Sequence, residues 1–127
     1  DREGITRQRR GQDKVREVTL QNYSHKCAFC AVREETFLVA AHISRWADDR
    51  ENRGNLANLI CMCRPHDSLF EVGYFSLSDD YRIIIKPHDH QGAVDLLLRN
   101  LSVFRRPKSH SPDPRLLQKH RHRHGLE

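Results

Sequence analysis

The sequence predicts a small α+β domain that is held together by one structural zinc ion. Cys27-Ala-Phe-Cys30 and Cys63-Arg-Pro-His66 form two short-spaced ligand pairs with 32 residues between them, which suits a single tetrahedral zinc. Only 37% of the 127 residues are hydrophobic, so the core is small, and chains with small cores often need a metal to fold. Short apolar stretches between flanking helical patterns complete the prediction.

The first expected element is a helix over residues 9–24. Its apolar positions fit one helix face, and they are Val15, Val18, Leu20 and Tyr23. A short apolar strand over residues 37–40 then runs into His42. Residues 45–55 are mostly polar and predict an exposed loop.

The second strand is expected over residues 59–62, with Cys61 buried in it. Pro65 suits the first turn of a helix that runs to about Val72, and Gly73 ends that helix. Residues 74–77 and 81–86 flank a polar turn and predict a β-hairpin.

Two helices are expected in a basic carboxyl-terminal segment over about 93–125. The first covers residues 93–100 and the second begins at Pro112-Asp113-Pro114. In the second helix we expect Leu116 and Leu117 to pack inward. Its basic residues, Lys119, Arg121 and Arg123, are expected to face outward, and its histidines are expected to be solvated or to face phosphates.

The zinc ligands allow one alternative set. Cys61 and Cys63 could form the second pair, which would leave His66 free for another metal. We favour Cys27, Cys30, Cys63 and His66, because Cys63 and His66 straddle the start of a helix, as in a zinc knuckle. Two disulfides are a weaker alternative, since Cys-x-x-Cys is a poor local disulfide and no apolar leader precedes the cysteines. Zinc binding implies the reducing cytoplasm.

The charge balance favours a polyanionic partner. The formal net charge is +5 and the isoelectric point is about 9.3, which suits nucleic acid. No segment approaches the ~20 apolar residues that cross a bilayer, so no membrane partner is expected.

The order of these motifs resembles the HNH endonuclease family, in its restriction-type form. The resemblance is carried by Cys-x-x-Cys, then Ala41-His42-Ile43, then Asn58-Leu59-Ile60, then Cys-x-x-His followed by Asp67, and it spans roughly residues 9–123. It implies a ββα-metal core, over about 25–86, clipped by the structural zinc. It also implies a metal-dependent DNA endonuclease that leaves 5′-phosphate and 3′-hydroxyl ends.

The resemblance assigns roles to three side chains. His42 matches the general base that activates water, a task that suits an imidazole with a pKa near 6.5. Asn58 matches the residue that holds the loop carrying this base. Asp67 matches the last histidine of the motif and is the expected ligand of a divalent cation such as Mg²⁺ or Mn²⁺. Glu71, one helical turn later, could add a second carboxylate.

One position departs from the family pattern. Family members usually carry a metal ligand directly before the base histidine, where this chain has Ala41. The full ligand set of the catalytic metal is therefore left open. Contacts to the phosphates of double-stranded DNA are expected from four arginines around the site, which are Arg45, Arg50, Arg53 and Arg64.

The whole chain is expected to form one HNH nuclease domain over residues 1–127. It begins at Asp1 without Met, which suits a fragment of a longer protein with a separate DNA-recognition domain. One active site cuts one strand, so double-strand cleavage would need a homodimer or two successive events. Two other functions compete with a nuclease: a non-catalytic zinc module that binds nucleic acid, and a zinc-stabilised protein-interaction domain.

Overall fold

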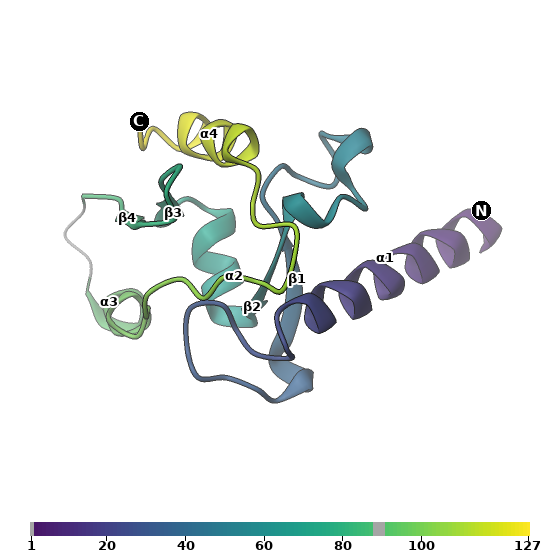
Figure 1. Cartoon of the computed structure of the whole chain (residues 1–127), viewed down its shortest axis with the longest axis horizontal. Helices are drawn as coiled ribbons and strands as arrows, with labels where there is room; N and C mark the ends of the chain where they lie inside the picture. Colours follow the sequence, from purple (N-terminus) through teal and green to yellow (C-terminus); the bar gives the residue numbers. More distant parts are fainter. Residues whose placement is uncertain (1, 88–90) are drawn as a thin grey trace.

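Four α-helices, three short 3-10 turns and two small antiparallel sheets make up the described part of the chain (Figure 1). The computed structural model describes residues 2–87 and 91–127, with side chains described from Gly11 onward. The α-helices are α1 (Arg2–Asn22), α2 (Arg64–Glu71), α3 (Gly92–Arg99) and α4 (Pro114–Arg123). The strands are β1 (Leu38–His42), β2 (Leu59–Cys63), β3 (Phe75–Leu77) and β4 (Ile83–Ile85). The 3-10 turns are η1 (Glu35–Phe37), η2 (Arg50–Asn52) and η3 (Leu56–Asn58).

The first sheet pairs β1 with β2, so that Leu38 lies opposite Cys63 and His42 opposite Leu59. Both α1 and α2 pack against this sheet, which explains why every residue of β2 is buried. The α+β class and the ββα order of β1, β2 and α2 are therefore confirmed. In this sheet His42 ends β1, and Cys63 ends β2 directly before α2.

Aromatic side chains form the centre of the core. The ring of Phe29 contacts Phe75 at 5.2 Å and Phe104 at 5.4 Å between centroids, and Phe75 also contacts Phe70 at 5.4 Å. These rings join residues 27–30 (the knuckle), α2, the β3–β4 hairpin and the segment before α4. Aromatic burial of this size gives a short chain much of its core energy.

The predicted elements differ from the observed ones mainly at their ends. Helix α1 begins at Arg2, well before the expected residue 9, although it ends at Asn22 close to the predicted end. Strand β1 begins at Leu38, because Phe37 lies in the 3-10 turn η1 with 53% of its surface exposed. The expected loop over residues 45–55 contains the 3-10 turn η2.

Helix α4 corrects one prediction about its faces. Leu116 and Leu117 are buried as expected, but Arg121 is only 7% exposed instead of facing outward. Its guanidinium donates to the Leu77 carbonyl at 2.8 Å and pairs with Asp79 at 2.8 Å and Glu127 at 2.7 Å. These acceptors satisfy a buried cation, so Arg121 anchors α4 on the hairpin.

His120 is likewise buried rather than solvated. Its Nε2–H donates to the Phe70 carbonyl at 2.8 Å, and its Nδ1 accepts from the Ser76 hydroxyl at 2.7 Å. Its ring stacks on Phe70 with centroids 3.8 Å apart. Burial lowers the pKa of His120 to about 3, so the ring is neutral and structural.

No helix within residues 2–87 and 91–127 combines the length and the apolar character that crossing a membrane requires.

Candidate active site and metal centre

Four side chains from two distant segments converge at the amino end of α2. The donor atoms of Cys27, Cys30, Cys63 and His66 all lie within 4.8 Å of one another, and all four cysteines of the chain are free thiols. Three sulfurs and one imidazole nitrogen are a usual ligand set for tetrahedral zinc. The group predicted from the sequence is therefore brought together, and it could hold a zinc ion.

Neighbouring groups orient these ligands. The Nε2–H of His66 donates to the Leu97 carbonyl at 2.9 Å, so Nδ1 carries the lone pair and lies 3.3 Å from the Cys63 sulfur. The Arg105 guanidinium donates to the carbonyl oxygens of Cys27 and Cys30 and holds the knuckle in place. A hydrogen bond from the Cys63 thiol, helped by His66, lowers the pKa of Cys27 to about 3. Contacts of this kind fix a ligand's tautomer and direction before metal arrives.

Cys61 stays outside the ligand group. It is fully buried in β2, and burial raises the pKa of its thiol to about 12, so it remains protonated. Side chains two residues apart on a strand share a face, so Cys61 lies on the same face of β2 as Cys63. Strand alternation alone therefore does not exclude Cys61 as a zinc ligand. The clustering of the donor atoms decides between the two ligand sets.

His42 lies at the end of β1. Its Nε2 lies 3.1 Å from the Arg53 carbonyl, which can only accept, so Nε2 carries the proton and Nδ1 is the basic nitrogen. The Trp46 ring meets the imidazole edge to face at 5.3 Å between centroids. Burial lowers the pKa of His42, so the ring is neutral near pH 7.

His42 lines a cleft of about 550 Å³ together with Asp67 and Glu71. Burial, followed by repulsion from Glu71, raises the pKa of Asp67 to about 6. Glu71 pairs with Arg45 across the cleft, with 3.0 Å between Oε1 and Nε. A neutral imidazole and two carboxylates thus share one open site.

These carboxylates fit a divalent cation of the Mg²⁺ type. Such ions bind proteins through one or two carboxylates and keep several waters, so a preformed protein cage is not required. The raised pKa of Asp67 marks a buried acid that a cation would stabilise in its charged form. Within the described residues, the Cys₃His group is the one set of three or more donor atoms that lie close enough together to hold a metal ion. The side chains that line the cleft therefore do not form such a set before a cation binds.

Ala41 cannot contribute to this cleft. Its side chain is 2% exposed and belongs to the core, whereas Ala40 and His42 line the cleft. This alternation follows from the strand geometry of β1. The two carboxylates that line the cleft, Asp67 and Glu71, both come from α2.

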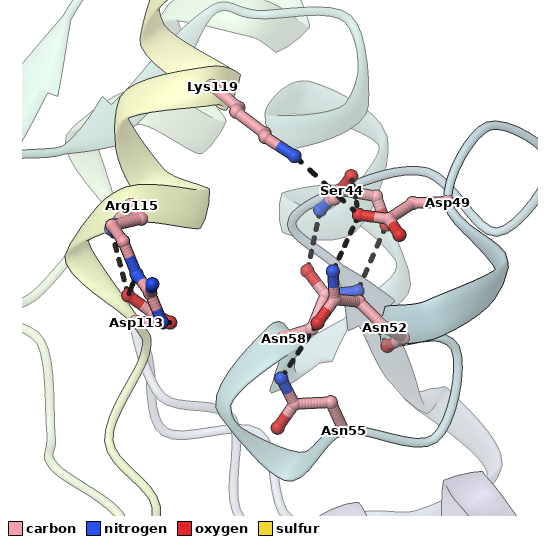
Figure 2. Close-up of polar contacts among 8 residues, drawn as sticks. All are labelled: Ser44, Asp49, Asn52, Asn55, Asn58, Asp113, Arg115 and Lys119. Carbon is pink, nitrogen blue, oxygen red and sulfur yellow. Dashed lines mark hydrogen bonds and ion pairs between the residues drawn. The ribbon is translucent and has the colours of Figure 1, made fainter.

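Asn58 ties together the loop that follows His42 (Figure 2). Its Oδ1 accepts from the Ser44 N–H at 2.7 Å, and its Nδ2 donates to the carbonyls of Ser44 at 3.1 Å and Asn52 at 3.0 Å. The side chain is fully buried, so these bonds satisfy the whole amide. Asn58 therefore braces backbone and does not line the cleft.

A second polar layer around this loop was not anticipated. Figure 2 shows Asp49 at its centre, where it accepts from the Ser44 hydroxyl and the Asn52 amide at 2.8 Å each. Lys119 of α4 points toward the same carboxylate, 4.0 Å away. Asn55 donates to Asn52 at 2.9 Å and caps η3. In the sequence, the one feature that could have predicted this network is the high frequency of Asn and Asp in residues 48–58.

The four arginines expected to bind phosphates occupy different positions. Arg45 borders the cleft, and Arg50 is exposed in η2. Arg53 is used within the loop, where it donates to the Trp46 carbonyl at 2.6 Å and stacks on the Trp46 ring at 4.8 Å. Arg64 donates to the Thr36 carbonyl at 3.2 Å. Arg45 is also paired with Glu71, so Arg50 is the exposed arginine of the four without a described partner.

Residues 27–78 match a family model described as HNH endonuclease, a segment that includes the four candidate zinc ligands and the cleft. The chain carries an HNH endonuclease core. Within the matched segment, β1, β2 and α2 form a ββα unit, and the segment includes His42 and Asn58.

One solved structure extends the likeness beyond the HNH core. A modification-dependent TagI restriction endonuclease is similar over 87% of this chain, with a TM-score of 0.61 and 19% identity. At this identity the likeness shows a shared fold. The matched region is 37% of that chain, so this chain spans little more than a third of that enzyme's length. A search of curated proteins finds no match to the sequence.

Proposed function

We propose that this chain is the DNA-cleaving module of a restriction-type enzyme. It would hydrolyse phosphodiester bonds in double-stranded DNA with His42 as the general base. The observation that carries the proposal is the arrangement of His42, whose Nε2 is fixed by the Arg53 carbonyl while its ring lines a cleft with Asp67 and Glu71.

In this proposal, Nδ1 of His42 takes a proton from a water molecule. The water oxygen attacks phosphorus, the bond from phosphorus to the 3′ oxygen breaks, and the leaving oxygen takes up a proton. The products carry a 5′-phosphate and a 3′-hydroxyl. The lowered pKa of His42 favours this role, because the base must be neutral before it can accept a proton.

Asp67, with Glu71 beside it, would hold a divalent cation such as Mg²⁺ or Mn²⁺. When bound, that ion would supply positive charge to the phosphate and the leaving oxygen. Arg45 neutralises Glu71 in the structure and would compete with the ion for that carboxylate. Asn58 would act only by holding the loop after His42 in position.

We further propose that the Cys₃His group holds zinc, that the protein works in the reducing cytoplasm, and that a separate recognition domain accompanies this module. The share of the TagI structure that the chain matches supports such an arrangement. Since one cleft cuts one strand, a homodimer would produce a double-strand break.

The proposal is tested by plasmid nicking. Zinc-loaded protein is incubated with supercoiled plasmid and Mg²⁺, Mn²⁺, Co²⁺ or Ni²⁺, and His42→Ala is compared with the exposed His110→Ala. We expect His42→Ala to lower the nicking rate by about 10²–10⁴-fold, the usual contribution of a general base, and His110→Ala to leave it unchanged.

The outcomes separate the competing functions. If no cation supports nicking that depends on His42, the nuclease proposal is wrong. DNA retardation without nicking would then favour a nucleic-acid-binding zinc module. Absence of both would favour a protein-interaction domain.

A further inference from the structure

A basic pocket lies between the end of α1, the zinc knuckle and the segment that leads toward α4. The cavity measures about 340 Å³ and shares no lining residue with the catalytic cleft. Its lining contains five cationic side chains and no acidic one. The five are Lys26, Arg33, Arg105, Arg106 and Lys108.

The five cations of this pocket have no acidic partners among the described residues. None of the five forms an ion pair with a carboxylate in residues 11–87 and 91–127. By contrast, Arg82, Arg99 and Arg115 each pair with a neighbouring aspartate at 3.0–3.2 Å. Like charges gathered in a concavity repel one another, and a bound anion would remove that repulsion.

The walls of the pocket are fixed before any ligand binds. Asn22 at the end of α1 accepts from the Lys108 N–H at 2.9 Å through its carbonyl, and its side chain exchanges hydrogen bonds with the Ser109 backbone at 2.8 and 3.0 Å. Arg105 is held by the knuckle carbonyls, and Arg106 lies 4.9 Å from the centroid of the Tyr81 ring. The pocket is therefore preorganised, which lowers the entropy cost of binding.

Three of the cations remain available to a ligand. The charged ends of Lys26, Arg33 and Lys108 have no acceptor in the part of the chain that the structure describes, whereas Arg105 and Arg106 are already engaged. Lysine and arginine in this arrangement match the oxygens of a phosphate group.

We propose that this pocket binds a phosphate of the DNA backbone, at a contact separate from the catalytic cleft. The inference rests on the proposed nuclease function for the identity of the ligand. A phosphate contact of this kind would position the duplex without reading its sequence.

The test compares two variants with the same loss of charge. One combines Lys26→Gln, Arg33→Gln and Lys108→Gln, and the other combines Arg82→Gln, Arg99→Gln and Arg115→Gln, whose arginines are paired with acids. Both carry His42→Ala, so that binding is measured without cleavage, and the zinc content of each verifies its fold. DNA affinity is measured by fluorescence anisotropy across a range of salt concentrations.

We expect the pocket variant to bind more weakly and its log–log salt slope to fall by about 0.9, the value for one phosphate contact. The paired-arginine variant should keep the wild-type slope. Equal slopes in both variants, or no DNA binding by the parent protein, would overturn the proposal.

A second arm distinguishes DNA from a free phosphate compound. Tripolyphosphate binding is measured by calorimetry on the same proteins. If the pocket variant loses tripolyphosphate binding while its DNA salt slope is unchanged, the pocket serves a free polyphosphate, and the DNA assignment is wrong. If the salt slope depends on the pocket but the protein with His42 intact does not nick plasmid, only the proposed catalytic function is wrong.

Discussion

Burial acts in opposite directions on two titratable residues that line the cleft, His42 and Asp67. It lowers the pKa of His42 and raises that of Asp67 to about 6, because a site poor in water disfavours whichever form is charged. A neutral imidazole is ready to accept a proton. A carboxyl that keeps its proton near pH 6 binds a cation only after releasing it.

Metal binding in the cleft should therefore depend on pH. With a pKa of about 6, Asp67 is mostly protonated at pH 5.5 and ionised at pH 7.5, so we expect Mn²⁺ affinity to be about fourfold weaker at the lower pH. Affinity should rise through pH 6 and level off above it. Electron paramagnetic resonance of Mn²⁺ added to zinc-loaded protein would measure this.

Asp67→Asn is the matched control, since it removes the titrating group and keeps the shape. This variant should bind Mn²⁺ weakly at both pH values. A pH step of the same size in Asp67→Asn would assign the dependence to another residue.

At the scale of elements, α2 connects both sites with the last helix of the chain. It carries His66 in its first turn and Asp67 and Glu71 on the side of the cleft. At its far end, Gly73 adopts a φ of +85°, and α4 docks there through His124. The position of α4 thus depends on a close backbone approach that only glycine permits.

Gly73→Ala should destabilise the protein by two separable effects. A Cβ at position 73 would lie 2.3 Å from Nδ1 of His124, and an L side chain is strained at this φ. We expect a loss of about 1–3 kcal/mol in the free energy of unfolding, measured by chemical denaturation with zinc present. Gly54→Ala, whose Cβ would meet no atom within 4 Å, should have little effect.

A double-mutant cycle isolates the contact with His124. In the His124→Ala background only the backbone strain remains, so Gly73→Ala should cost less there than in the wild type. The same cost in both backgrounds would show that the two helices do not meet as described.

The elements that could be predicted are those whose signal is local. A short apolar run identified β2, Pro65 and Gly73 marked the two ends of α2, and a polar turn marked the hairpin that follows. The buried position of Arg121 could not be predicted, because its acceptors Leu77 and Asp79 lie 44 and 42 residues earlier. A basic residue in a basic helix gives no sign that it will be buried.

For the molecule as a whole, the Cys₃His group brings distant parts of the sequence together. The knuckle at Cys27 and Cys30 meets the start of α2, and Arg105 ties the later segment to the same carbonyls. The ligand spacing made this site predictable. The basic pocket was not predictable, since its walls come from residues 23–33 and 105–108 and only the folded chain brings them together.

Removing zinc should unfold the domain. Structural zinc contributes about 10–16 kcal/mol in zinc-finger peptides, which is comparable with or larger than the stability of most small domains. We expect a chelator, or Cys27→Ser, to abolish the cooperative thermal transition followed by circular dichroism.

Cys61→Ser provides the comparison, because this buried cysteine lies outside the ligand group. It should retain one zinc per chain and lose only packing energy. Loss of zinc from Cys61→Ser, or a zinc-free Cys27→Ser that still melts cooperatively, would contradict the assignment of ligands.

Helix α1 leaves the body of the molecule as a straight arm (Figure 1). Among the residues whose side chains are described, Arg16 anchors this helix to the Leu38 and Glu35 carbonyls, and α1 also packs on β1 and β2. Each residue of an α-helix adds about 1.5 Å along the helix axis and a rotation of about 100° around it. A recognition domain joined to this helix would be held at a fixed distance and angle from the cleft, because the helix is rigid. The number of base pairs between the recognised site and the cut would then follow the length of α1, with the periodicity of a helix.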